Sequence, residues 1–167
     1  MGYEIFEMAM NEFRYFAGEL AYRFDDRYRL RLTVMEVDLT ERHLGSSWES
    51  EAIDGSGVSG YFRGYELHLQ RFVWRGFYLS GAAGYFHDLY EEDASGQRVS
   101  NHTPTLGVGL GYNWREPFGI PYLYLDLAMP FRFYFNDIEE QQLGDATVRR
   151  HLIVNNLWLF IGATVPF

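Results

Sequence analysis

The sequence has no cysteine, no lysine and no long apolar run, and the first and last of these absences each exclude a class of protein. Without cysteine the chain has neither a disulfide framework nor thiol chemistry. Without a run of about 18 apolar residues it has no transmembrane helix. The net charge of -9 argues against a nucleic-acid partner. No Walker, Rossmann or zinc motif is present, so we expect no cofactor and no metal site.

Aromatic residues are abundant instead. They make up 19% of the 167 residues, and they favour strands over helices. Apolar residues recur at every second position, most clearly in a run that covers about 40 Å at about 3.3 Å per residue. This run consists of Leu123, Leu125, Leu127, Met129, Phe131, Phe133 and Phe135. It is longer than the strands of typical globular proteins, so we expect long antiparallel strands.

Alternation of this kind predicts seven strands, over residues 13–24, 28–40, 57–73, 77–88, 103–114, 122–136 and 149–167. An eighth strand is expected over Tyr3 to Met10, although the spacing there also fits an amphipathic N-terminal helix. Residues 35–39 change phase, which predicts either a bulge or the point where the second strand leaves a membrane.

The connections between these strands alternate in length. Residues 25–27 and 74–76 are tight turns, and 115–121 is somewhat longer. The other connections are long and polar, and they cover residues 41–57, 88–102 and 136–147. Short periplasmic turns and long extracellular loops are typical of outer-membrane barrels. We therefore expect an all-β, antiparallel up-and-down transmembrane β-barrel, with eight strands in a single domain over residues 1–167.

Two segments carry a family resemblance. Residues 18–32 look like the first periplasmic hairpin of small outer-membrane barrels, and the chain ends in an alternating apolar strand that includes Leu159, Ile161, Val165 and Phe167. As an architecture the whole chain resembles the small eight-stranded outer-membrane barrels, most closely the OmpA membrane domain, OmpX and NspA. The resemblance implies the bacterial outer membrane, contact with its lipid and lipopolysaccharide, and recognition of the terminal strand by the barrel-assembly machinery.

Polar side chains alternate with the apolar ones and would face the lumen. An eight-stranded barrel is just wide enough for side chains to fill. Small residues such as Gly107, Gly109 and Gly111 make room for large ones, which favours a plugged lumen. We expect aromatic girdles, with Trp74, Phe77, Trp114, Phe118 and Tyr122 on the periplasmic side and Tyr61, Phe62, Phe133 and Phe135 on the outer side. Tyr78, Tyr122, Tyr124, Tyr134, Trp158 and Phe160 are also candidates for the lumen. Buried charges need partners, so we predict a polar network of Glu19, Arg29, Arg31, Glu66, His68, Asp126 and Arg132.

We therefore predict a monomer with a structural or surface-interaction role. Three alternatives stay open: a narrow gated pore, a lipid A-modifying enzyme, and a soluble lipocalin-like barrel with its apolar face inside. Two lipid A-modifying families share this architecture, and both use His and Ser with an acidic partner. The corresponding candidates here are His43, Ser46, Ser47, His87, Asp88, Ser100, His102 and His151. The inline His-x-Ser of the deacylase family is absent, so no residue is assigned as catalytic.

Overall fold

The fold was analysed in a computed structural model, which describes residues 1–5, 9, 15–39, 57–135, 141–144, 146–148, 153–155 and 157–165. No helix within these ranges is long and apolar enough to cross a membrane. One short 3₁₀ helix, η1 (Pro117–Gly119), lies between two strands.

In the described part of the chain, eight antiparallel strand positions close into a barrel. The strands are β1 (Gly2–Glu4), β2 (Tyr15–Arg23), β3 (Tyr28–Leu39), β4 (Val58–Trp74), β5 (Phe77–Glu92), β6 (Arg98–Arg115), β7 (Leu123–Tyr134), β10 (Ile153–Asn155) and β11 (Trp158–Ala163). Both β10 and β11 pair with β7 and together fill the eighth position. The barrel closes where β1 pairs with β11 on one side and with β2 on the other. A separate hairpin consists of β8 (Gln141–Leu143) and β9 (Ala146–Val148).

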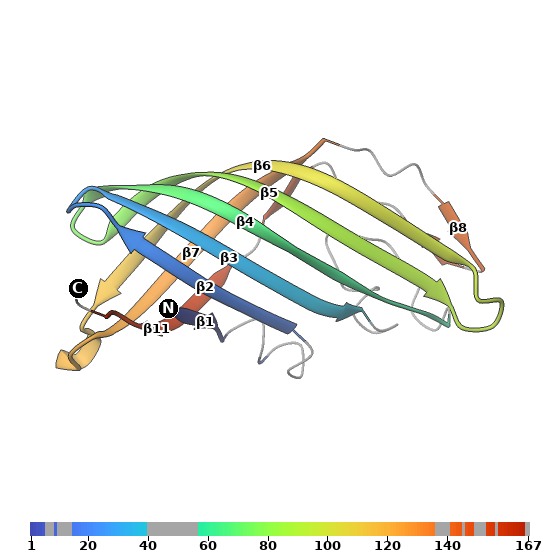
Figure 1. The fold of residues 1–167 in the computed structure, drawn as a ribbon, viewed down its shortest axis with the longest axis horizontal. Helices are drawn as coiled ribbons and strands as arrows, with labels where there is room; N and C mark the ends of the chain where they lie inside the picture. Colours follow the sequence, from blue (N-terminus) through green and yellow to red (C-terminus); the bar gives the residue numbers. More distant parts are fainter. Residues whose placement is uncertain are drawn as a thin grey trace.

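The two ends of the barrel differ. Residues 24–27, residues 75–76 and the η1 segment connect strands at the end that also holds both chain termini (Figure 1). The β5–β6 turn and β8 lie at the opposite end, on the right of the same view. We call these the turn end and the far end of the barrel.

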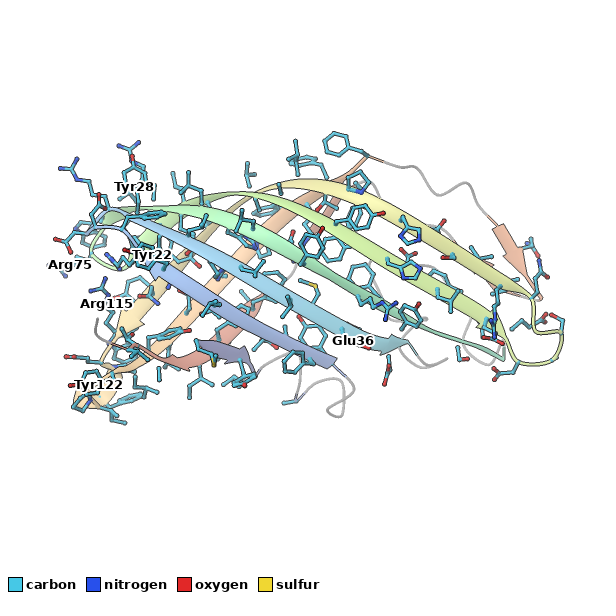
Figure 2. The ribbon with its side chains drawn as sticks, viewed as in Figure 1. Tyr22, Tyr28, Glu36, Arg75, Arg115 and Tyr122 are labelled. Carbon is cyan, nitrogen blue, oxygen red and sulfur yellow. The ribbon has the colours of Figure 1, made fainter. Side chains whose placement is uncertain are left out.

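The barrel is apolar outside and largely polar inside at its turn end. Alternate residues of each strand point to opposite faces of a sheet. On β4 the outward side chains Leu67 and Leu69 are about half exposed, whereas Glu66, His68 and Gln70 between them are buried. Figure 2 shows Tyr22, Arg75, Arg115 and Tyr122 gathered at the turn end, while Glu36 lies nearer the far end.

Two predictions about segments were wrong, and one of the two alternatives for a third segment is excluded. Residues 88–102 do not form a long loop, because β5 continues to Glu92 and β6 begins at Arg98. The N-terminal strand is shorter than expected: it ends at Glu4, and Ala9 is helical, with its N–H donating to the Ile5 carbonyl at 3.1 Å. Residues 35–39 contain no bulge, since every residue of β3 pairs in register with β4. The change of phase instead marks a change in the chemistry of the interior, where Met35 follows Thr33.

Two side chains also differ from their predicted places. Phe62 is 6% exposed and faces the interior instead of an outer girdle. Tyr122 is 58% exposed at the end of the β6–β7 connection, so it does not fill the lumen. Outward apolar positions place Trp74, Phe77, Trp114 and Phe118 on the surface at the turn end, as predicted.

Candidate functional site in the barrel lumen

Asp126 on β7 is the centre of the buried polar network. Its carboxylate accepts hydrogen bonds from the Tyr78 hydroxyl at 2.6 Å and from the Asn113 side-chain amide at 2.9 Å. It also accepts from the guanidinium groups of Arg29 and Arg31. Asn113 is the register partner of Asp126 on the adjacent strand β6, whereas the other three donors come from β3 and β5 and reach Asp126 across the lumen. A carboxylate with this many donors is fully compensated for its loss of water.

Arg31 joins Asp126 to a second carboxylate. Its Nη1 lies 3.3 Å from Glu19 Oε2 on β2 and 3.3 Å from Asp126 Oδ1. The other oxygen of Glu19 accepts a hydrogen bond from the Tyr124 hydroxyl at 2.5 Å. Arg29 extends the same group, since its Nε donates to Gln70 Oε1. The turn-end half of the lumen therefore contains one continuous set of ion pairs and hydrogen bonds.

A second ion pair lies farther along the lumen. Arg132 on β7 makes a bidentate contact with Glu66 on β4, with both N–O distances at 2.8 Å. His68 Nε2 lies 3.5 Å from the same carboxylate. The Arg132 guanidinium also covers the Trp158 ring at 4.4 Å. Planar, bidentate geometry of this kind is the strongest form of a carboxylate–arginine contact.

Beyond this ion pair the interior is largely apolar, although the buried Asp88 and Thr103 also lie there. An apolar cluster, defined here as Met35, Val58, Phe62, Phe86, Tyr90, Val99 and Tyr134, occupies the far-end half of the lumen. Phe62 and Phe86 stack with their ring centroids 4.8 Å apart, and Phe86 lies 6.3 Å from Tyr134. The cluster separates the ion pairs from the far end. The lumen thus contains two chemically different layers in series.

Comparison with protein-family models, with curated proteins and with solved structures gives no match for this chain. The lumen and the outer surface are therefore interpreted from their own chemistry.

The seven residues proposed from sequence for the polar network are all buried in the lumen. The structure brings Arg29, Arg31, Glu19 and Asp126 together, and it places Glu66, Arg132 and His68 in the second group. Four partners were not assigned to the network from sequence: Gln70, Tyr78, Asn113 and Tyr124. Their inward position in the alternation was visible, but a hydroxyl or amide on an inward face does not reveal which carboxylate it reaches.

The histidines and serines considered for catalysis do not assemble into a triad in the described ranges. His87 Nε2 lies 2.9 Å from Ser100 Oγ, and Nδ1 lies 3.4 Å from the Tyr61 hydroxyl. Asp88 faces the other side of β5, where Asn101 donates to it. His43, Ser46, Ser47 and His151 lie outside the described residues, as does Phe167 of the expected assembly signal. Among the described residues, no group of three or more His, Cys, Asp or Glu side chains is arranged to hold a metal ion.

Proposed function

We propose that this chain is an integral barrel of the bacterial outer membrane, with a plugged, ion-paired lumen and a structural or surface-interaction role. The observation that carries the proposal is the reversed polarity of the barrel wall. Charged side chains such as Glu66, Asp126 and Arg132 are at most 2% exposed, whereas Leu69, Leu79 and Val108 are at least half exposed. Burying charge and exposing apolar surface is unfavourable in water and favourable in lipid.

The distribution of aromatic residues gives further support. Four exposed aromatic side chains lie near the turn-end termini of their strands: Tyr22, Trp74, Phe77 and Trp114. Tyr65 and Tyr85 are also exposed, and they stack at 6.4 Å nearer the far end. Between these two groups the outward positions are chiefly aliphatic. Two aromatic girdles around an apolar band are the surface pattern of outer-membrane barrels.

Electrophoretic mobility tests this proposal directly. The protein is refolded separately in detergent and in buffer alone, and each sample is run on a denaturing gel with and without boiling. We expect a compact, unboiled form that shifts in mobility on boiling, and we expect it to require detergent. Closed barrels resist the gel detergent because each strand pairs with a neighbour on both sides, so no strand edge is left unpaired.

A β-rich monomer that folds in buffer alone would overturn the proposal. That result would favour the soluble lipocalin-like alternative, and the next experiment would then be a search for an apolar ligand. A heat-shifted barrel that needs detergent would support the outer-membrane barrel, and a conductance measurement would then distinguish a plugged lumen from a conducting one.

A further inference from the structure

A row of cationic side chains crosses the outer face of three neighbouring strands. Arg63 on β4 is the register partner of His87 on β5, and His87 is the register partner of His102 on β6. Arg63 and His102 are exposed and His87 is half-buried, while the residues beside them in the chain face the lumen. The two imidazole rings stack in parallel, with centroids 4.1 Å apart and planes at 4°. We call Arg63, His87 and His102 the cationic row.

The cationic row lies just beyond the apolar band. The next outward row toward the turn end is Tyr65, Tyr85 and Pro104. On β5, Phe77 and His87 are separated by about 33 Å at about 3.3 Å per residue. A strand tilt of about 40° makes this about 25 Å along the barrel axis, which is the height of the apolar band of such barrels. With Phe77 at one interface, the cationic row is therefore at the level of the headgroups on the other side.

Arg63 carries the fixed positive charge of the row, and the two imidazoles beside it add charge only when they are protonated. The row continues onto β3 at Glu36, the register partner of Arg63 and the only carboxylate at this level among the described outward residues. Glu91, closer to the far end, is paired with Arg98 at 2.9 Å. Asp88 faces the lumen. A group of potential cations on the outside of a chain with net charge -9 is suited to an anionic ligand.

Hydrogen-bond donors surround the same place. The Ser100 hydroxyl contacts His87 Nε2 at 2.9 Å, and the Tyr61 hydroxyl lies 3.4 Å from Nδ1. The Arg63 guanidinium lies over the Tyr61 ring at 4.6 Å, which limits the positions it can adopt. Arginine, imidazolium and hydroxyl groups together are suited to the oxygens of a phosphate group. A Ser–His pair without an oriented carboxylate lacks the third member of a hydrolytic triad.

We propose that the cationic row binds the phosphate of a phosphorylated lipid headgroup in the outer leaflet. The proposal rests on the proposed function, because it needs the apolar band to lie in lipid. Two stacked imidazoles repel each other when both are protonated, and a bound phosphate relieves this repulsion. Lipid binding is therefore coupled to imidazole protonation. The polar and charged groups near the two imidazoles are Arg63, Glu36, Tyr61, Tyr85, Ser100 and the more distant Asp88.

Histidine NMR of the refolded protein tests this inference. The protein is labelled at histidine, refolded in a non-ionic detergent that contains no phosphate, and titrated with phosphatidic acid. His87→Gln and His102→Gln assign the two resonances. We expect phosphatidic acid to shift both resonances and to raise the pKa of His87, which burial and the neighbouring His102 and Arg63 lower in the free protein, because the phosphate stabilises the imidazolium form. Diacylglycerol, which has the same tails without the phosphate, should shift neither.

Three further variants define the site. Arg63→Gln should weaken phosphatidic acid binding about tenfold, since it removes one charge-assisted contact. Glu36→Gln should strengthen binding, since it removes the neighbouring negative charge. Arg71→Gln should change nothing, because Arg71 is also exposed and outward on β4 but lies near the turn end.

The inference is overturned if diacylglycerol gives the same shifts, or if Arg71→Gln weakens binding as much as Arg63→Gln. If inorganic phosphate binds as tightly as phosphatidic acid, the ligand is free phosphate and not a lipid headgroup. All variants are first checked for the heat-dependent gel shift. A protein that shows the gel shift but does not bind phosphatidic acid contradicts only this inference. A protein that folds without detergent contradicts the proposed function.

Discussion

At the scale of single residues, the lumen depends on close contacts between glycine and large side chains. A Cβ atom at Gly111 would overlap the hydroxyl of Tyr78, the group that donates to Asp126. A Cβ at Gly64 would similarly overlap the Phe86 ring in the apolar cluster. The alternation of glycine with large residues therefore sets how tightly both layers of the lumen pack. In a filled interior even one added methyl group must displace its neighbours.

Gly111→Ala should reduce the free energy of unfolding by about 1–3 kcal/mol, the usual cost of overpacking a filled core. The measurement is urea unfolding of the refolded protein in lipid vesicles. Gly81→Ala is the matched control, since a Cβ there meets nothing within 4 Å. An equal loss in both variants would mean that the Tyr78–Asp126 contact does not limit the space at Gly111.

At the scale of strands, period-two alternation predicted the positions of the strands well and their ends poorly. The run from Leu123 to Phe135 corresponds closely to β7 (Leu123–Tyr134), because alternation continues for as long as one face is apolar and the other is not. Beyond the apolar band this contrast fades. The outward residues of β5 then include His87 and Glu91, so its continuation to Glu92 resembled a polar loop in sequence.

The interior was harder to predict than the exterior for a related reason. An inward position can hold either a charged or an apolar side chain, and alternation alone does not distinguish them. Arg31 and Met35 both face inward from β3, yet they lie in different layers of the lumen. The inward charged set could be selected from sequence by residue type, whereas Phe62 was assigned to the wrong face because an aromatic residue suits either one. Pairings such as Arg132 with Glu66 depend on strand register, which the sequence pattern does not specify.

The loss of stability caused by an arginine at an outward position should depend on the depth of that position in the membrane. Val108 and Val73 are both outward and both 56% exposed, but Val108 is near mid-height on β6 and Val73 is at the turn end of β4. We expect Val108→Arg to destabilise the barrel in vesicles by about 2–4 kcal/mol and Val73→Arg by at most about 1 kcal/mol. Urea unfolding in vesicles gives both values. A soluble barrel would tolerate the two equally, so identical small effects would argue against the lipid-facing band.

At the scale of the whole molecule, the plugged lumen proposed above would depend on two layers of side chains arranged in series. The ion pairs around Asp126 and Glu66 fill the part nearer the turn end, and the apolar cluster fills the part nearer the far end. Opening a water path requires the ion pairs to rearrange and the aromatic rings to move. Breaking a buried pair costs about 3–5 kcal/mol, so ion pairs alone already oppose opening.

We therefore expect no steady conductance from the wild-type protein in a planar bilayer. The double variant Phe62→Ala and Phe86→Ala should also show no steady conductance. It removes two aromatic rings from the apolar cluster but leaves the Glu66–Arg132 pair in place. Single-channel recording measures the conductance of the wild type and of the variant, after the heat-dependent gel shift has shown that each protein is folded. Steady current through the wild type would refute the plugged lumen and favour the narrow pore.

The closure of the barrel has a consequence for the order of folding. Along β2 to β6 each strand pairs with the next one in the chain, so these contacts form between near neighbours in sequence. The seam between β1 and β11 is different: Tyr3 pairs with Ile161 across almost the entire chain. Bringing such distant segments together carries the largest loop-closure entropy of any pairing in the sheet. We therefore expect closure of the seam to be the slowest step of assembly, and until it forms the sheet presents two unpaired strand edges.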